Sequence, residues 1–223
     1  MQYEIEIKSL LGSQNATDAF LKKVQKLDPS CQLVNEQKQL NHYFKGGAIP
    51  KLVAEFVSEL TDEQVAMLKT IAERATSVNV RSRQKNNTTL LIVKGSLDAT
   101  SAAHSHQRME FEAPLALSID VLDQRIERAG WQLEAKWQAE RKMYEAFGLT
   151  LDIFFSPGYG YLVEFEKVVD SESERKSAYR QVIATMEQLG VAELANDRLE
   201  RMFAYYNEHW REYYGTRNIF TVE

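Results

Sequence analysis

The chain has little of what marks a secreted, membrane-spanning or nucleic-acid-binding protein. It has one cysteine, Cys31, so no intrachain disulfide can form and a reducing compartment is expected. No apolar run approaches the roughly 20 residues of a membrane span, and no basic-then-apolar leader opens the sequence. The net charge of −5 argues against a general nucleic-acid binder. We therefore expect a soluble, cytoplasmic protein that binds neither membrane nor nucleic acid.

The first predicted strand alternates acids with isoleucines. Successive side chains of a strand point to opposite faces, so Glu4, Glu6 and Lys8 share one face while Ile5 and Ile7 share the other. A half-buried strand with its charges in solvent has the same pattern. The pattern alone therefore does not distinguish a functional face from a solvated one.

Recurrence of this pattern favours a function. Glu110-Phe111-Glu112 and Glu164-Phe165-Glu166 repeat it, and Arg81-Ser82-Arg83 is its basic version. If these strands lie in one sheet, one of its faces is lined by carboxylates and cations together. Carboxylates suit a hard divalent cation and arginines suit phosphate oxygens, so the pattern predicts a metal–polyphosphate site.

Turn signals and alternation predict eight strands, most of them joined as hairpins or meanders. The predicted strands cover residues 3–8, 40–45, 79–85, 90–95, 107–113, 140–146, 149–155 and 161–168. Eight antiparallel strands can close into a barrel with an enclosed lumen. The predicted fold class is α+β: an eight-stranded antiparallel β-barrel, or tunnel, with peripheral helices and a C-terminal helical segment.

Helical periodicity and capping signals predict the remaining elements. The predicted helices lie between Thr17 and Pro29, over 61–75, between Ser118 and Gly130, between Ser171 and Gly190, and over 198–214. We expect a single domain over 1–223, with the barrel in 1–168, a helical insertion at about 46–76 and C-terminal helices in 169–223. An aromatic stripe on the last helix is expected to dock on the barrel or on a second subunit, which leaves a homodimer open.

The ordered set of charged motifs resembles the CYTH family, also called triphosphate tunnel metalloenzymes. The matching pieces are Glu4-Ile5-Glu6-Ile7-Lys8, Arg81-Ser82-Arg83, Leu91-Ile92-Val93-Lys94, Arg108-Met109-Glu110-Phe111-Glu112, Arg141-Lys142-Met143-Tyr144, Leu151-Asp152 and Gly160-Tyr161-Leu162-Val163-Glu164-Phe165-Glu166. The resemblance covers roughly residues 3–168. It implies a tunnel that binds a triphosphate together with Mg²⁺ or Mn²⁺.

The resemblance also implies roles for individual residues. The implied metal ligands are Glu4, Glu6, Glu164 and Glu166, with Asp152, Glu110 and Glu112 nearby. The implied phosphate contacts are Lys8, Arg81, Arg83, Lys94, Arg108 and Arg141. Glu4 or Glu6 is expected to orient the attacking water, beside Lys8. Pairing with the arginines is the alternative role for Glu110 and Glu112.

The chain departs from the family pattern at one phosphate contact. Many members carry a lysine where this chain has Ala139, and alternation puts the nearby Lys136 on the other strand face. His104 and His106 lie in a polar stretch over residues 96–106 that we interpret as a loop rather than a metal site, and His42 is expected to be structural.

The family's activities leave three functions open. The leading hypothesis is a metal-dependent hydrolase of inorganic or organic triphosphate, such as tripolyphosphate, thiamine triphosphate or ATP. The alternatives are a class IV-type adenylyl cyclase that makes cyclic AMP from ATP, and a binding module for polyphosphate or nucleotide that does not turn its ligand over.

Overall fold

The structure, a computed structural model, describes residues 3–97 and 108–221. By its internal contacts the chain divides into two compact units. Residues 1–38 and 138–223 form one, called here the terminal unit, and residues 39–137 form the other, the central unit. His104, His106 and the side chain of Arg108 lie outside the described residues.

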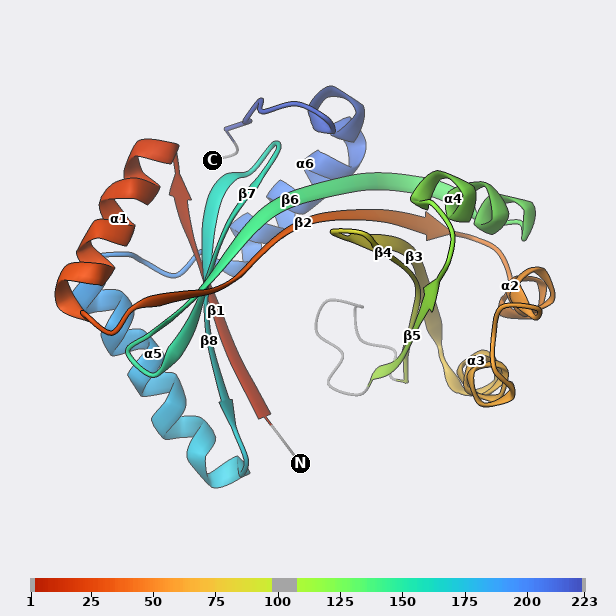
Figure 1. Cartoon of the computed structure of the whole chain (residues 1–223), viewed down its shortest axis with the longest axis horizontal. Coiled ribbons are helices and arrows are strands. Elements are labelled where there is room, and N and C mark those ends of the chain that lie inside the picture. The colour runs from red at the N-terminus through yellow and green to blue at the C-terminus, as the bar shows by residue number, and fades with distance from the viewer. Residues whose placement is uncertain (1–2, 98–107, 222–223) are drawn as a thin grey trace. The chain divides into compact units, whose positions relative to one another are not determined.

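Eight strands form one hydrogen-bonded antiparallel sheet in the order β1-β8-β7-β6-β2-β3-β4-β5, which confirms the predicted fold class (Figure 1). Among the described strands, hydrogen bonds do not close this order into a ring. The strands are β1 (Tyr3–Gly12), β2 (Gln32–Lys45), β3 (Ser77–Lys85), β4 (Thr88–Ser96), β5 (Arg108–Leu115), β6 (Gln132–Ala146), β7 (Leu149–Ser156) and β8 (Gly160–Val169).

The helices are α1 (Gln14–Leu27), α2 (Ile49–Phe56), α3 (Asp62–Arg74), α4 (Ile119–Arg128), a short η1 (Glu172–Glu174), α5 (Arg175–Leu189) and α6 (Asn196–Tyr213). The first helix begins earlier than predicted, because Ser13 rather than Thr17 is its N-cap and accepts a hydrogen bond from the backbone of Ala16. The structure also adds α2, which the sequence did not predict. None of the helices in the described ranges is long and apolar enough to cross a membrane.

Two strands are much longer than expected. The sequence predicted 40–45 and 140–146, whereas β2 and β6 begin at Gln32 and Gln132. The first half of β2 is mostly exposed on both faces, and its two apolar residues, Leu33 and Val34, are adjacent and 48% and 46% exposed. Alternation of apolar and polar residues cannot reveal such a strand, because neither of its faces is buried.

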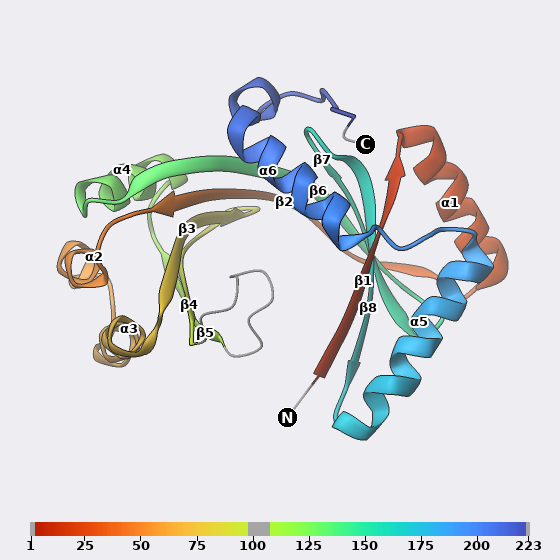
Figure 2. The same ribbon diagram turned by 180° about the vertical axis from the view of Figure 1, so that it is seen from behind.

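In the terminal unit, α1 and α5 cover one face of the sheet formed by β1, β8 and β7 (Figures 1 and 2). The apolar residues of the alternating strands face these helices: Ile7 and Phe165 pack in one cluster with Phe20 of α1 and Val182 of α5. The charged residues that alternate with them must therefore lie on the opposite face of the sheet.

The connection from α5 to α6 crosses the outer edge of β1. The backbone N–H of Leu194 donates to the carbonyl of Lys8 at 2.7 Å. Beyond it, α6 docks through Tyr206, which is buried and lies 5.8 Å from the ring of Tyr159, centroid to centroid. The expected docking of the aromatic stripe is thus found within the chain itself, although Phe203 of this stripe stays 45% exposed.

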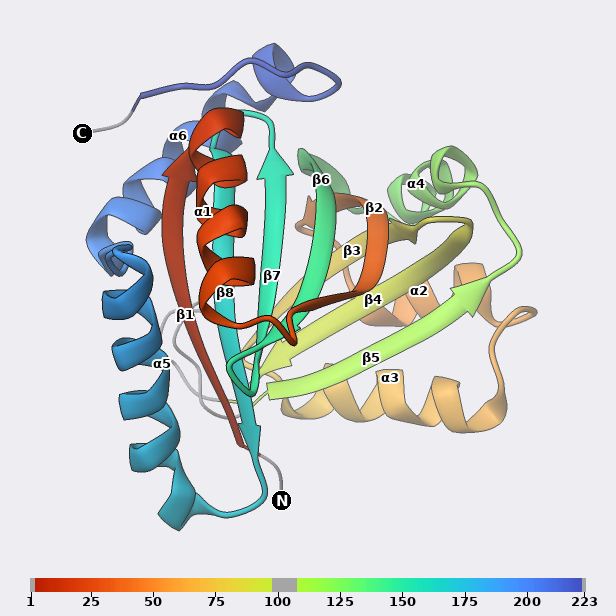
Figure 3. The same ribbon diagram turned by 60° about the vertical axis from the view of Figure 1, so that its left-hand side comes forward.

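In the central unit, α2 and α3 lie against one face of β3, β4 and β5 (Figure 3). The shared core contains Phe56 of α2, Leu68 of α3, Val80 of β3 and Val93 of β4. Helix α3 begins with a capping box, in which Thr61 and Gln64 exchange hydrogen bonds.

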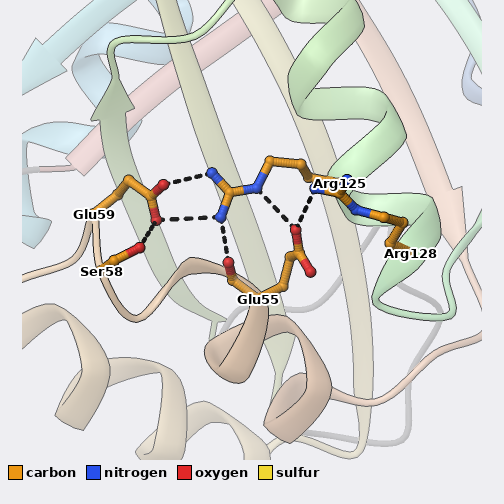
Figure 4. Close-up of polar contacts among 5 residues, drawn as sticks. All are labelled: Glu55, Ser58, Glu59, Arg125 and Arg128. Atoms are coloured by element: carbon orange, nitrogen blue, oxygen red, sulfur yellow. Dashed lines mark hydrogen bonds and ion pairs between the residues drawn. The ribbon is translucent and has the colours of Figure 1, made fainter.

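An ion-pair network links α4 to α2 and to the turn that follows it (Figure 4). The guanidinium of Arg125 donates to Glu55 at 2.9 Å and to Glu59 at 2.5 Å, and it stacks over the ring of Phe56. Hydrogen bonds from Arg125 lower the pKa of both carboxyls below their ordinary value. Arg128 also reaches Glu55, at 2.8 Å, but its side chain is 65% exposed whereas that of Arg125 is 13% exposed.

We predict that this difference in burial decides the contribution of each arginine to stability. Arg125→Ala should lower the free energy of unfolding by about 2 kcal/mol, since it leaves carboxylates without their buried partner. Arg128→Ala, the matched control, should change it by less than about 0.5 kcal/mol, as exposed ion pairs usually do. Urea denaturation of the two variants tests the prediction, and equal effects would contradict it.

Candidate active site

Three neighbouring strands of the terminal unit bring the predicted acids together. In the pairing of β1 with β8, Glu6 lies opposite Glu166 and Lys8 lies opposite Glu164. In the pairing of β7 with β8, Asp152 lies opposite Glu164. Like charges placed directly opposite each other destabilise a sheet, so this register needs a compensating interaction.

The carboxylates form two overlapping groups. Oxygen atoms of Glu4, Glu6 and Glu166 lie within 4.8 Å of one another, and so do oxygens of Asp152, Glu164 and Glu166. Glu166 belongs to both groups. Glu4 and Glu6 are exposed, whereas Asp152 and Glu164 are buried, so the cluster extends from the surface into the protein.

Two cations offset part of this negative charge. Lys8 contacts Glu6 and lies 2.9 Å from Glu164. Arg141 of β6 donates to Asp152 at 2.8 Å and also contacts Glu164. Two cations for five carboxylates leave the cluster with excess negative charge.

The excess charge is visible in the protonation of the cluster. Burial, then the charges of Glu164, Asp152 and Glu4, raise the pKa of Glu166 to about 7. Burial also raises the pKa of Asp152, although Arg141 counteracts it. Oδ1 of Asp152 is buried and has no hydrogen-bond partner among the described residues.

These features fit a divalent cation. Mg²⁺ and Mn²⁺ prefer carboxylate oxygens, and a buried carboxylate oxygen without a donor is suited to a metal ion. Asp152, Glu164 and Glu166 could hold one ion, and Glu4, Glu6 and Glu166 supply a second group of oxygens. The structure thus brings together five of the seven predicted metal-site residues.

The other two predicted acids and most of the predicted phosphate contacts lie in the central unit. Arg81 and Arg83 alternate with Val80 and Ser82 along β3. Their side chains therefore project from the strand face that the helices do not cover. Burial, and then the charge of Arg81, lower the pKa of Arg83. Two neighbouring arginines with such mutual repulsion favour an anion between them.

Neutral side chains hold both arginines. Nε of Arg81 donates to Asn79 at 2.6 Å, and its guanidinium stacks over Tyr43, 4.4 Å from the ring centroid. Nε of Arg83 donates to Asn41, also at 2.6 Å. No carboxylate of the described residues forms an ion pair with either arginine. Their terminal nitrogens therefore remain available for an anion.

The lysine and the two acids of this unit allow more than one role. Lys94 forms an ion pair with Glu110 at 2.7 Å, so the described partner of this acid is a lysine and not one of the arginines that the sequence suggested. Glu112 is exposed, and it raises the pKa of Arg83 against the effect of burial. Metal ligation by Glu110 and Glu112 stays a prediction, as does the phosphate contact of Arg108.

Sequence reasoning missed Asn41, Asn79 and Tyr43. Asn41 lies two residues from Tyr43, and Asn79 lies two residues from Arg81. This spacing puts each pair on one face of its strand, and it is the signal in the sequence that could have suggested their contacts. Lys136 lies where alternation put it, on the helix side, with Nζ 3.2 Å from Asp123. His42 is buried against the same aspartate, as its expected structural role requires.

Comparison with known proteins supports the fold. No family model and no curated protein matches the chain. A conserved hypothetical protein from Pyrococcus furiosus superposes over 85% of this chain and 92% of its own length, with a TM-score of 0.54 and 19% identity. A provisionally assigned adenylate cyclase from Vibrio parahaemolyticus superposes over 91% of this chain and 98% of its own, with a TM-score of 0.55 and 16% identity.

A third similar structure belongs to a protein whose activity has been described. It is a provisionally assigned adenylyl cyclase from Hippeastrum that is described as having a dominant triphosphatase activity. It covers 93% of this chain and 96% of its own length, with a TM-score of 0.50 and 14% identity. At these identities the likeness shows a shared fold, which agrees with the resemblance seen in the motifs.

We predict that Glu166 makes the stability of the metal-free protein fall as pH rises. Its folded pKa of about 7 exceeds the ordinary value of 4.5, so between these values the folded state binds more protons than the unfolded state. With EDTA present, this group should remove about 2 kcal/mol of unfolding free energy across that interval, after allowance for its partial exposure. Glu166→Gln should abolish this loss and be more stable than wild type at pH 8.

Urea denaturation at pH 4.5, 6 and 8 measures the effect. The control is Glu187→Gln, which removes an exposed carboxylate of α5 outside the cluster. This control should keep the wild-type dependence on pH. An identical pH slope in wild type and Glu166→Gln would contradict the prediction.

Proposed function

We propose that the chain is a divalent-metal-dependent enzyme that hydrolyses an inorganic or organic triphosphate. The observation that carries this proposal is the convergence of five carboxylates from β1, β7 and β8 on one face, sharing Glu166 between two groups. A purely structural cluster of this kind would cost stability without compensation. A bound cation supplies the compensation and also binds phosphate oxygens.

The proposal assigns metal ligation to the acids and phosphate binding to the cations. The metal ligands are Glu4, Glu6, Asp152, Glu164 and Glu166, with Glu110 and Glu112 as further acids of the same role. When bound, Mg²⁺ or Mn²⁺ would neutralise phosphate charge and polarise the phosphoryl group. The phosphate-binding residues are Lys8, Arg81, Arg83, Lys94, Arg108 and Arg141.

The chemistry asks little of the protein beyond positioning and charge. A water oxygen forms a bond to the terminal phosphorus, the bridging P–O bond breaks, and its electron pair leaves with the diphosphate. Lysine and arginine side chains neutralise the charge that moves to the leaving group. Glu4 or Glu6, both exposed at the end of the cluster, would orient the water and accept its proton.

An adenylyl cyclase is the second candidate. The observation in its favour is the provisional assignment of structural neighbours as adenylate cyclases. In that reaction the ribose 3′ oxygen attacks the α-phosphorus and pyrophosphate leaves, so the same charged residues would serve. A module that binds polyphosphate without turnover is a further alternative. A cytoplasmic location and a homodimer also stay predictions.

Product analysis distinguishes these functions. The purified protein is offered tripolyphosphate, thiamine triphosphate and ATP separately, with Mg²⁺ and then with Mn²⁺. We expect orthophosphate from at least one triphosphate and none in EDTA. Pyrophosphate with cyclic AMP from ATP would replace the hydrolase by the cyclase. Metal-dependent binding without any product would leave the binding module.

We predict that removing a single charge from the carboxylate cluster strongly slows turnover. Glu6→Gln and Glu164→Gln should each lower kcat by about 100-fold or more, because preorganised charge is usually the largest contribution to such catalysis. Isothermal calorimetry with Mn²⁺ should show weaker metal binding for Glu164→Gln. Glu187→Gln serves as the control and should behave as wild type. Full activity in Glu6→Gln would remove the water-orienting role from this residue.

A further inference from the structure

We propose that Asp123, a buried carboxylate on the helix side of the central unit, is a positioning residue that sets the placement of Arg81 and Arg83. The part of this inference that concerns substrate binding rests on the proposed function. Its structural part, the placement of two arginines by an aspartate that does not contact them, can be tested without any substrate.

Asp123 holds three strands at once. It lies on α4, is 7% exposed, and accepts one contact from each strand. Nδ1 of His42 on β2 lies 2.7 Å from Oδ2, the hydroxyl of Ser82 on β3 donates to Oδ1 at 2.5 Å, and Nζ of Lys136 on β6 reaches Oδ2 at 3.2 Å. Burial works to raise the pKa of Asp123, but these partners keep it below its ordinary value.

The residues that Asp123 holds alternate with the candidate phosphate contacts. In the pairing of β2 with β3, His42 lies opposite Ser82, Tyr43 opposite Arg81, and Asn41 opposite Arg83. Ser82 is the residue between the two arginines, and His42 is the residue between Asn41 and Tyr43. The contacts of Asp123 with His42 and Ser82 are therefore each one residue away from an arginine or from a side chain that holds one.

This arrangement gives the carboxylate a role that an apolar side chain could not fill. Buried ionic groups contribute little net stability compared with apolar residues of the same size, but they can specify register. A slip of β3 by one residue would turn Arg81 and Arg83 toward the helices. It would also remove Ser82 from Asp123, so the carboxylate favours the register in which the arginines face away from the core.

The expected consequence concerns binding more than stability. Displacing a positioned charge by about 1 Å can cost on the order of 100-fold in activity. Asp123→Asn keeps the size of the side chain but loses the negative charge and one acceptor. We therefore expect the arginines to move while the carboxylate cluster of the terminal unit keeps its metal affinity.

The first experiment is NMR of the full chain labelled with ¹⁵N-arginine, in which the Nε–H signals of Arg81 and Arg83 are assigned with lysine variants at each position. Asp123→Asn should shift both signals. The controls are Asp120→Asn, an exposed aspartate on the same helix, and Thr61→Ala, which weakens the cap of α3 away from Asp123. Both controls should leave the signals in place.

The second experiment is calorimetry with tripolyphosphate and, separately, with Mn²⁺. Asp123→Asn should weaken tripolyphosphate binding at least tenfold and leave Mn²⁺ binding unchanged. In a variant that carries both Arg81→Ala and Arg83→Ala, the further change Asp123→Asn should have little additional effect, because Asp123 acts through these two arginines. Rescue by Asp123→Glu, which restores the charge, would further separate positioning from loss of fold.

Ser82→Ala keeps the proposal testable if Asp123→Asn does not fold, since it removes a single contact of the carboxylate. Unshifted Arg81 and Arg83 signals in the folded variants would overturn the inference. A wild-type chain that binds no tripolyphosphate would defeat the proposed function instead, while the NMR comparison would still decide whether Asp123 positions the arginines.

Discussion

Electrostatic repulsion among carboxylates is the constraint on which the terminal unit depends. Asp152, Glu164 and Glu166 lie close together, and among the described residues of the unit Lys8 and Arg141 are the cations that form ion pairs with them. This repulsion destabilises the folded state. Burial of the apolar face of the same strands offsets it, since Ile7 and Phe165 pack under α1 and α5. A pKa of about 7 for Glu166 shows that the compensation is incomplete without a cation.

The central unit also brings like charges together, but these charges are positive. Arg81 and Arg83 repel each other, and amide oxygens of Asn79 and Asn41 hold them rather than carboxylates. Neutral acceptors fix the direction of a guanidinium without neutralising its charge, so the positive charge remains for a ligand. The buried Asp123 adds a negative charge on the helix side of the sheet, where it accepts a hydrogen bond from Ser82 and does not contact the arginines.

Alternation predicted which residues share a face, because a period of two follows directly from strand geometry. It therefore put Glu4 and Glu6 on one strand face and Lys136 on the helix side, whereas Asp152 came from the resemblance to a family. It could not reveal the first half of β2, neither of whose faces is buried, or the short α2. The burial of Asp152 and the partners of Asp123 depend on residues distant in sequence, which no local pattern contains.

The outer edge of β1 also bears on how copies of the chain meet. An edge strand offers unpaired backbone groups to any other strand, and natural proteins protect such edges with charges or coverage. Leu194 covers the edge at Lys8, and beyond it Glu4 and Glu6 remain exposed. A second β1 pairing there in antiparallel fashion would bring acid against acid. The residues proposed to bind metal therefore also oppose edge-to-edge aggregation, a protection that a metal-free solution at neutral pH would keep.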